Sequence, residues 1–208
     1  LREIAENRQE FHATDERPVP EFAEKIRGLQ QDLVMLWRKA SGYNNLSPGD
    51  GGGHLFIIRA SDGTLLRTIS TGAGDTTTPS GLSRISAWAN FPEANNTAQR
   101  VYGGDQLGNL WRFDVNGDIP LPAVPPATPV YDVQRLATLK DPSGVAQPIT
   151  TRPELGKVGP HAVVYVGTGQ LLGTDDLATT QTQTIYAIKD RLLDEDYGSP
   201  RPLSPPQT

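Results

Sequence analysis

Apolar and polar positions alternate most clearly in residues 100–115, R-V-Y-G-G-D-Q-L-G-N-L-W-R-F-D-V. Val101-Tyr102 predicts a short strand, and the glycine-containing residues 103–105 and 108–109 predict tight turns that use positive φ. After these turns, a period of two predicts a strand with two different faces. One face carries Trp111, Phe113 and Val115, and the other carries Arg112 and Asp114. This stretch therefore predicts one corner of an all-β unit.

Short strands of this kind recur after residue 41, and they predict a mostly β fold. The other expected strands are residues 54–59, 64–69, 82–88, 131–139, 145–151, 162–166 and 184–188. Ser61-Asp62-Gly63 predicts the turn of a hairpin between the first two, and Pro148 places residues 145–151 at a sheet edge or a bulge. The Pro-rich residues 116–129 are expected to form an irregular surface segment.

Residues 1–40 differ in character from the rest of the chain. Apolar residues at helical spacing, after Pro18 and Pro20, predict an amphipathic helix over residues 21–32. The apolar positions at this spacing are Phe22, Ile26, Leu29, Leu33 and either Leu36 or Trp37. Residues 34–37 also fit a strand, because the Ser41-Gly42 turn follows closely. The helix is expected either to dock a partner, to pack on the fold, or to be foreign to it.

A degenerate repeat organises the β region. Three times an apolar strand leads into a glycine-containing corner, through a loop, and into a strand with an aliphatic-aromatic pair. The corners are residues 41–42, 103–104 and 167–169, and the pairs are Leu55-Phe56, Leu110-Trp111 and Ile185-Tyr186. A unit with one apolar face cannot bury that face alone, so we expect these units to stack as blades of a partial, modified β-propeller. A β-sandwich of the same short strands is the alternative.

Composition agrees with this fold and excludes several function classes. The 208 residues include 21 Gly and 18 Pro, which disfavours a helical bundle. The net charge of −5 argues against a nucleic-acid or anionic-membrane partner, and no apolar run reaches the roughly 18 residues of a transmembrane helix. The absence of cysteine excludes disulfides and thiolate chemistry. We expect an excerpt of a longer protein, with a helical or non-family N-terminal segment at 1–40, a propeller fragment at 41–190, and a Pro-rich tail or truncated continuation at 191–208.

Candidate metal sites are sparse in this sequence. The three histidines lack the spacing of a transition-metal site, and we expect them to be solvated or to stabilise turns. They are His12, His54 and His161. Residues 114–118, D-V-N-G-D, imitate the start of a calcium-binding loop. Ile119 and Pro125 occupy the positions where that loop needs glycine and a bidentate glutamate, so we reject an EF-hand here. A looser site that uses backbone carbonyls is the alternative.

Candidate catalytic groups are equally sparse. Ser80-Gly81 lacks the pattern of a nucleophile elbow, and residues 51–53, G-G-G, precede a strand rather than the helix of a phosphate-binding loop. Asp175-Asp176 and the acidic run 190–196 are expected to be solvated, since a paired acid and base need burial to separate their pKa values. We therefore predict no catalytic, cofactor-binding or metal-binding residue. The aromatic residues expected in the core are Trp111, Phe113, Tyr165 and Tyr186.

Five separated motifs, in order, resemble the PilY/PilC-type family of type IV pilus assembly proteins and pilus-tip adhesins. They are S-G-Y-N-N-L-S-P-G-D-G-G-G-H-L-F-I-I, T-T-T-P-S-G-L-S-R-I-S-A-W, R-V-Y-G-G-D-Q-L-G-N-L-W-R-F-D-V, Q-P-I-T-T-R-P-E-L, and V-V-Y-V-G-T-G-Q-L-L-G-T-D-D-L with Q-T-I-Y-A-I-K-D. The resemblance covers residues 41–190 and concerns the C-terminal β-propeller of the family. It implies export through the periplasm to the cell surface, at the pilus tip or outer membrane. The implied roles are pilus extension, surface attachment and twitching motility, with minor pilins, other tip components and a host or abiotic surface as partners.

Two departures from the family pattern limit what the resemblance implies. Many members carry an Asp-rich calcium loop directly before the strand that Val101-Tyr102 matches, and calcium is implied to regulate retraction. Here residues 93–99, E-A-N-N-T-A-Q, hold one carboxylate, so no calcium site is carried over. Residues 1–40 lack the apolar strand expected before the first corner, either through divergence or because unrelated upstream sequence is joined there.

The alternative from another class is an enzyme, because quinone-dependent dehydrogenases are also built from blades with aromatic strands. Such enzymes need a calcium beside the cofactor, often a vicinal cysteine pair, and a closed ring of about four to eight blades. This chain has no cysteine and too few blade units, so we expect no enzyme activity. A generic propeller scaffold without a pilus role is a second alternative. Surface contacts are expected first in the insert-like loops at residues 72–80 and 169–183.

Overall fold

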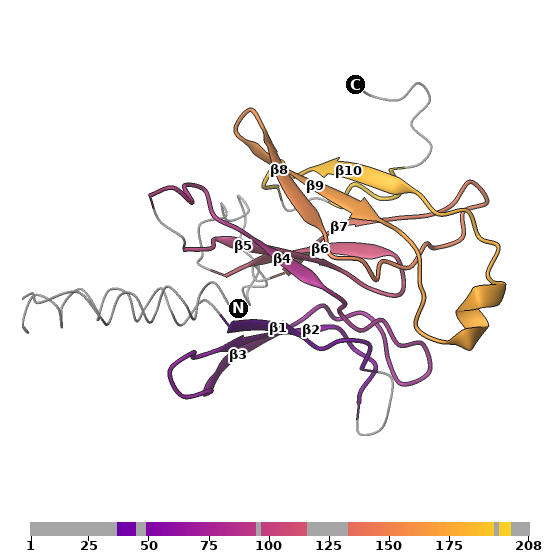
Figure 1. Cartoon of the computed structure of the whole chain (residues 1–208), viewed down its shortest axis with the longest axis horizontal. Coiled ribbons are helices and arrows are strands. Elements are labelled where there is room, and N and C mark those ends of the chain that lie inside the picture. Colours follow the sequence, from indigo (N-terminus) through magenta and orange to yellow (C-terminus); the bar gives the residue numbers. More distant parts are fainter. Residues whose placement is uncertain (1–36, 45–48, 95–96, 116–132, 194–195, 201–208) are drawn as a thin grey trace, which may run out of the picture.

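The computed structural model describes residues 37–44, 49–94, 97–115, 133–193 and 196–200 (Figure 1). In this part of the chain the backbone forms three antiparallel β-sheets and one short 3-10 helix, which confirms the mostly β prediction. The helix predicted at residues 21–32 and the Pro-rich segment at 116–129 lie outside the described residues. Within those residues, no helix has the length and hydropathy needed to cross a membrane.

The first sheet contains β1 (Trp37–Ala40), β2 (His54–Ile58) and β3 (Leu65–Ser70), in that order. β2 and β3 form the predicted hairpin, and Gly63 in its turn has a φ of 77°. Glycine is favoured there because a Cβ would strain this backbone conformation. β1 shares only Trp37 with the strand alternative at residues 34–37, whose first three residues lie outside the described part of the chain.

The second sheet contains β4 (Ile85–Trp88), β5 (Arg100–Gly104), β6 (Asn109–Asp114) and β7 (Val133–Thr138), in sequence order. Every residue of β5 and β6 is buried. The two predicted faces of β6 are confirmed, because Trp111 and Phe113 lie in one core cluster whereas Arg112 pairs with Asp190 after the third sheet. The sequence 100–115 thus forms the centre of the molecule.

The third sheet contains β8 (Glu154–Val158), β9 (His161–Gly167) and β10 (Ile185–Lys189), with β9 in the middle. The helix η1 (Thr174–Ala178) lies in the connection from β9 to β10. The strand predicted at residues 145–151 is wrong, because Ala146 and Ile149 form only isolated bridges there. Pro148 lacks the N–H group that a sheet ladder needs, and the strand begins later, at Glu154.

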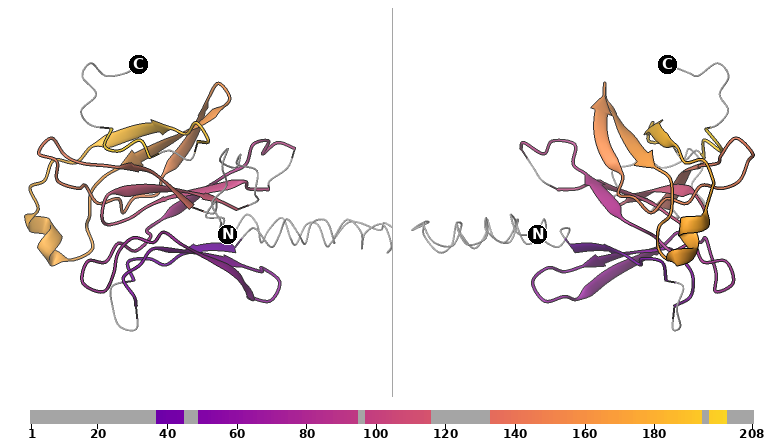
Figure 2. Two further views of the ribbon diagram at one scale, coloured as in Figure 1. Left: turned by 180° about the vertical axis from the view of Figure 1, so that it is seen from behind. Right: turned by 45° about the vertical axis from the view of Figure 1, so that its right-hand side comes forward.

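The three sheets stack face to face, with the second sheet in the middle (Figures 1 and 2). The core between the first and second sheets includes Leu55, Ile69, Val101 and Phe113. The core between the second and third sheets includes Tyr102, Leu110, Val164 and Tyr186. In a two-layer sandwich each sheet has one buried face, whereas β5 and β6 are buried on both faces. The arrangement is that of propeller blades.

The predicted repeat marks equivalent strands in the three sheets. The corners at residues 41–42, 103–104 and 167–169 lie at the ends of β1, β5 and β9, and the aliphatic-aromatic pairs lie in β2, β6 and β10. By this equivalence, the first sheet has no counterpart of β4 among the described residues. Likewise, the third sheet has no counterpart of β7 in the described part of the chain.

Gly103 and Gly104 do not form the turn that the sequence predicts. Both lie in β5 with a φ outside the positive region. A Cβ on Gly104 would lie 2.2 Å from Cγ2 of Ile149, so glycine here allows close approach of the neighbouring segment. The turn between β5 and β6 is formed instead at Gly108, whose φ is 80°.

A buried ion pair joins the second and third sheets. Arg112 Nη1 lies 2.9 Å from Asp190 Oδ1, and the two side chains are 2% and 0% exposed. Tyr102 Oη donates a hydrogen bond of 2.7 Å to Asp190 Oδ2. Burial, followed by the nearby Asp190 carboxylate, raises the pKa of Tyr102 well above its usual value. The prediction that residues 190–196 are a solvated run is therefore wrong at Asp190, whose side-chain partners Tyr102 and Arg112 lie far earlier in the sequence.

Candidate functional site

Five connections lie together at one end of the molecule, on the right in Figure 1. We call this end the loop face, and it consists of the described parts of residues 41–53, 71–84, 105–108, 139–153 and 168–184. Backbone hydrogen bonds join neighbouring connections, since Gln106 N–H donates to Ser80 O at 2.9 Å and Ile149 N–H donates to Asp105 O at 2.8 Å. Both insert-like loops predicted from the sequence, 72–80 and 169–183, lie on this face.

One aspartate in each connection of the loop face acts as a turn cap. Its carboxylate accepts hydrogen bonds from backbone N–H groups two to four residues away. The five caps are Asp50, Asp75, Asp105, Asp141 and Asp176. Bonds from backbone N–H groups hold the pKa of three of these carboxyls, Asp50, Asp75 and Asp176, below its usual value because they favour the charged form. The loops are therefore fixed by their own carboxylates.

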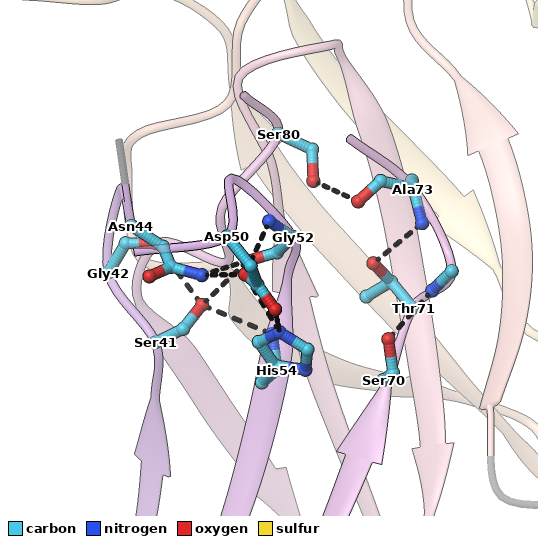
Figure 3. A network of polar contacts seen from close by, with 11 residues as sticks. Ser41, Gly42, Asn44, Asp50, Gly52, His54, Ser70, Thr71, Ala73 and Ser80 are labelled. Carbon is cyan, nitrogen blue, oxygen red and sulfur yellow. Dashed lines mark hydrogen bonds and ion pairs between the residues drawn. The ribbon is translucent and has the colours of Figure 1, made fainter. Parts of the chain in front are cut away.

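Asp50 connects the two ends of the 41–53 connection (Figure 3). Its carboxylate accepts a hydrogen bond from Asn44 Nδ2, and its Oδ2 lies 2.9 Å from His54 Nε2. Asn44 Nδ2 also donates to Gly52 O at 2.9 Å, and His54 N–H donates to Ser41 Oγ at 3.1 Å. His54 thus helps to stabilise a turn, which is one of the roles expected for it.

The 71–84 connection lies against the first one through close backbone contact. Ser80 Oγ donates to Ala73 O at 2.6 Å and holds the two ends of this connection together (Figure 3). Gly51 has a φ of 77°, and a Cβ at this position would lie 1.9 Å from Asp75 O. The glycines at 51–53 therefore let two connections approach each other closely.

Asp105 is the buried centre of the loop face. Its Oδ2 accepts hydrogen bonds from Trp111 Nε1 at 2.8 Å and from Asn109 Nδ2 at 2.9 Å. Its Oδ1 accepts backbone N–H groups of Leu107 and Asn109, each at 2.9 Å. Burial raises the pKa of Asp105, although these donors oppose the shift. Every carboxylate oxygen is used within the turn, so the role of Asp105 is architectural.

The 168–184 connection is anchored at its end and exposes apolar side chains. Gln181 Nε2 donates to Ala146 O at 2.9 Å, and Gln147 Nε2 donates to Thr182 O at 2.5 Å. Its exposed leucines are Leu171, Leu172 and Leu177, with 69%, 41% and 74% of their surface accessible. Three exposed leucines in one loop make it a candidate contact surface. The sequence indicated this loop by its length, but it did not indicate which residues are exposed.

Metal ligands are not brought together in the described part of the chain, where no group of three or more His, Asp or Glu side chains could hold an ion. Before β5, Ala94 N–H donates to Phe91 O at 3.0 Å in a turn, and residues 95–96 lie outside the described chain. Asp114 is buried at the end of β6, and residues 116–118 also lie outside it. The absence of a calcium site therefore stays a prediction.

The aromatic residues expected in the core divide into two groups. Trp111, Phe113 and Tyr186 are buried, as predicted. Tyr165 is 42% exposed, so the prediction is wrong for this residue. It pairs with Ala187 of β10 on the face of the third sheet that carries exposed side chains.

Comparison with known proteins shows which domain family the three stacked sheets resemble. Residues 31–199 match the family model of the PilY1 β-propeller domain. The type IV pilus biogenesis factor PilY1 of Pseudomonas aeruginosa is 33% identical over 167 residues, which cover 73% of this chain and 14% of that protein. A PilY1 homolog of Xylella fastidiosa is 29% identical over 161 residues, which cover 72% of this chain and 10% of that protein.

A solved structure supports the same assignment. The crystal structure of the Pseudomonas aeruginosa PilY1 C-terminal domain is similar with a TM-score of 0.56 and 25% identity, over 77% of this chain and 39% of that chain. The chain thus spans a small part of the length of these relatives. The match at residues 31–199 contains all three sheets and the five motifs, so the chain belongs to the family of the PilY1 β-propeller domain.

Proposed function

We propose that this chain is a non-enzymatic propeller fragment of a type IV pilus biogenesis factor and tip adhesin. The observation that carries the proposal is the match of residues 31–199 to the PilY1 β-propeller domain. Its proposed roles are support of pilus extension, surface attachment and twitching motility. Its proposed place is the cell surface, at the pilus tip or outer membrane, where minor pilins or other tip components and a host or abiotic surface are its partners.

The loop face supports a role in attachment. Its connections are held by aspartate caps and by backbone bonds, so the backbone that carries its exposed side chains is fixed. Leu171 and Leu177 project from the 168–184 connection with most of their surface accessible. A preorganised apolar contact loses little entropy on binding, and this favours attachment to an apolar surface.

Deletion of the gene tests the pilus role. We expect the deletion strain to lose surface pili and twitching, and the full-length gene to restore both. Unchanged pili and twitching would contradict the proposal. The dehydrogenase alternative predicts a bound quinone, which a visible-range spectrum of the reconstituted protein would detect.

Serine substitutions test the loop face separately from pilus assembly. A double variant with Leu171→Ser and Leu177→Ser is expected to lower surface attachment roughly tenfold while leaving the number of pili unchanged, because it removes about 1.4 kcal/mol or more of apolar contact. The matched control is Phe91→Ser, at the opposite end of the molecule, where Phe91 is 62% exposed. Equal attachment by both variants and the parent strain would exclude the leucines from the contact.

A further inference from the structure

The outer edge of β7 is covered by a short segment that follows the third sheet. Tyr197 N–H donates to Leu136 O at 2.7 Å, and Thr138 N–H donates to Gly198 O at 2.9 Å. β7 is the last strand of the second sheet, so these bonds satisfy backbone groups that an edge strand leaves open. We call residues 196–198 the edge segment.

Two side chains of the edge segment, Asp196 and Tyr197, add an ion pair and an apolar contact to these backbone bonds. Nε and Nη2 of Arg135 each lie 2.7 Å from Asp196 Oδ2. The Tyr197 ring packs against the core between the second and third sheets, and the Arg191 guanidinium lies 5.1 Å from its centroid. The edge of β7 therefore holds a carboxylate followed directly by an aromatic ring.

The edge segment is held more weakly than a strand of the sheet. Two backbone hydrogen bonds attach it to β7, and it is not part of any of the three sheets. The Arg135 and Asp196 side chains are 46% and 31% exposed, and ion pairs at such sites contribute little to stability. Apart from the Tyr197 ring, residues 196–198 are exposed, and such a segment opens at a lower free energy than the sheet beneath it. Opening of this segment would leave the β7 edge free for another chain.

We propose that the outer edge of β7 is a strand-addition site for an extended segment of a partner protein, and that residues 196–198 occupy this site within the chain. In strand addition, main-chain hydrogen bonds supply affinity and the side chains supply specificity. The resident segment defines the chemistry of the partner: a carboxylate that pairs with Arg135, followed by an aromatic residue in the place of Tyr197. This inference goes beyond the proposed function, because it concerns the β7 edge and not the loop face.

Competition within the chain sets the expected binding behaviour. A partner segment binds only molecules in which the edge is open, so its apparent affinity is reduced by the fraction that is open. Detaching the edge segment should therefore raise the affinity without any change in β7 itself. Tyr197→Pro does this, because proline lacks the N–H that donates to Leu136 O.

The test uses the full chain and a fluorescent peptide with the sequence of residues 193–200, L-D-E-D-Y-G-S-P. We expect this peptide to bind the Tyr197→Pro variant about tenfold or more tightly than it binds the parent chain. A peptide with lysine in place of Asp196 should bind this variant several-fold more weakly, and Arg135→Asp in the chain should restore the affinity. Equal affinity of the parent and the variant, or equal binding of both peptides, would overturn the proposal.

A measurement on the parent chain covers the case in which Tyr197→Pro disturbs the core. Thr138 N–H donates to the edge segment, whereas Leu139 N–H donates to Gly108 O at 2.7 Å on the inner side. We expect amide hydrogen exchange to be faster at Thr138 than at Leu139, and excess peptide to slow the exchange at Thr138. Equal protection of the two amides, or no response to the peptide, would contradict an exchangeable occupant.

Discussion

The Asp105 carboxylate is fully buried and yet accepts four hydrogen bonds, two of them from the side chains of Trp111 and Asn109. Asp105→Asn would turn an NH₂ group toward these two side-chain donors. A buried donor that loses its acceptor costs about 1–3 kcal/mol. We therefore expect the free energy of unfolding to fall by about 3 kcal/mol, measured by urea denaturation.

Asp62→Asn is the matched control for this substitution. Asp62 Oδ1 accepts the Thr64 N–H at 2.9 Å in an exposed turn, and asparagine keeps an acceptor for that bond. We expect no measurable loss of stability. A similar loss in both variants would show that burial and the side-chain donors do not decide the role of Asp105.

The role of a single residue was predictable from the sequence where it depends only on the backbone conformation of the residue itself and its neighbours. Gly108 was expected in a turn, and its φ of 80° agrees. The role of Gly104 depends on Ile149, a contact from a segment 45 positions away that no local pattern indicates. The same holds for the donors of Asp105, because alternation predicts the face of Trp111 but not the direction of its Nε1. The glycines at 103–104 suggested a corner from their residue type, but only the packing shows that a side chain at Gly104 would collide with Ile149.

Strands were predictable where each carries its own apolar pattern. β2, β6 and β9 have such patterns and were expected close to their observed bounds. β8 was missed because E-L-G-K-V has few apolar residues and is mostly exposed or half-buried. Residues 145–151 include Ile149, which is fully buried, but this residue is buried as part of a loop and not of a strand. Burial alone therefore does not identify a strand.

The aspartate caps predict how the loops respond to acid. Three of the caps have a lowered pKa, so their stabilising effect is present above the unfolded value and is lost as the pH falls through the folded one. They are Asp50, Asp75 and Asp176. We expect the capped amides to titrate with midpoints below the ordinary aspartate value. NMR spectra of the backbone amides between neutral pH and acid would measure this.

Asp75→Asn is the internal control for this titration. Asp75 Oδ1 accepts the N–H groups of Thr77 and Thr78, each at 2.7 Å. The variant should remove the acid response of these two amides and leave that of Gly52, which Asp50 caps. Midpoints at or above the ordinary aspartate value would contradict the role of the caps.

At the scale of the whole molecule, the repeat predicted stacked blades, but not the contacts that join them. Alternation placed Arg112 on the face of β6 opposite to Trp111. In a sheet with only one buried face, Arg112 would then point into solvent. In the middle sheet both faces are buried, so a charge there needs a partner. Asp190 supplies it from 78 residues away. The acidic run at 190–196 thus contains a buried carboxylate, Asp190, and a partly exposed one, Asp196, a difference that its composition does not show.

The Arg112–Asp190 pair predicts how strongly the second and third sheets depend on one buried contact. Asp190→Ala removes the carboxylate that faces Arg112 and the acceptor of Tyr102 Oη. Breaking a buried pair by removing one partner costs about 3–5 kcal/mol, because a charge stays buried without its counter-charge. We expect this loss in the free energy of unfolding. Asp196→Ala, in the same acidic run but in an exposed pair with Arg135, should cost about 0–1 kcal/mol.

A third variant separates the charge of this pair from its packing. Arg112→Met combined with Asp190→Leu replaces both charged groups with apolar side chains, and such replacements of buried pairs are often close to neutral. We therefore expect the double variant to be more stable than Asp190→Ala alone, although Tyr102 Oη loses its acceptor in both. If Asp190→Ala and Asp196→Ala cost the same in urea denaturation, the buried pair does not hold the two sheets together. If the double variant is less stable than both Asp190→Ala and Asp196→Ala, the attraction within the Arg112–Asp190 pair exceeds the cost of removing the two charges from water, and the pair contributes net stability.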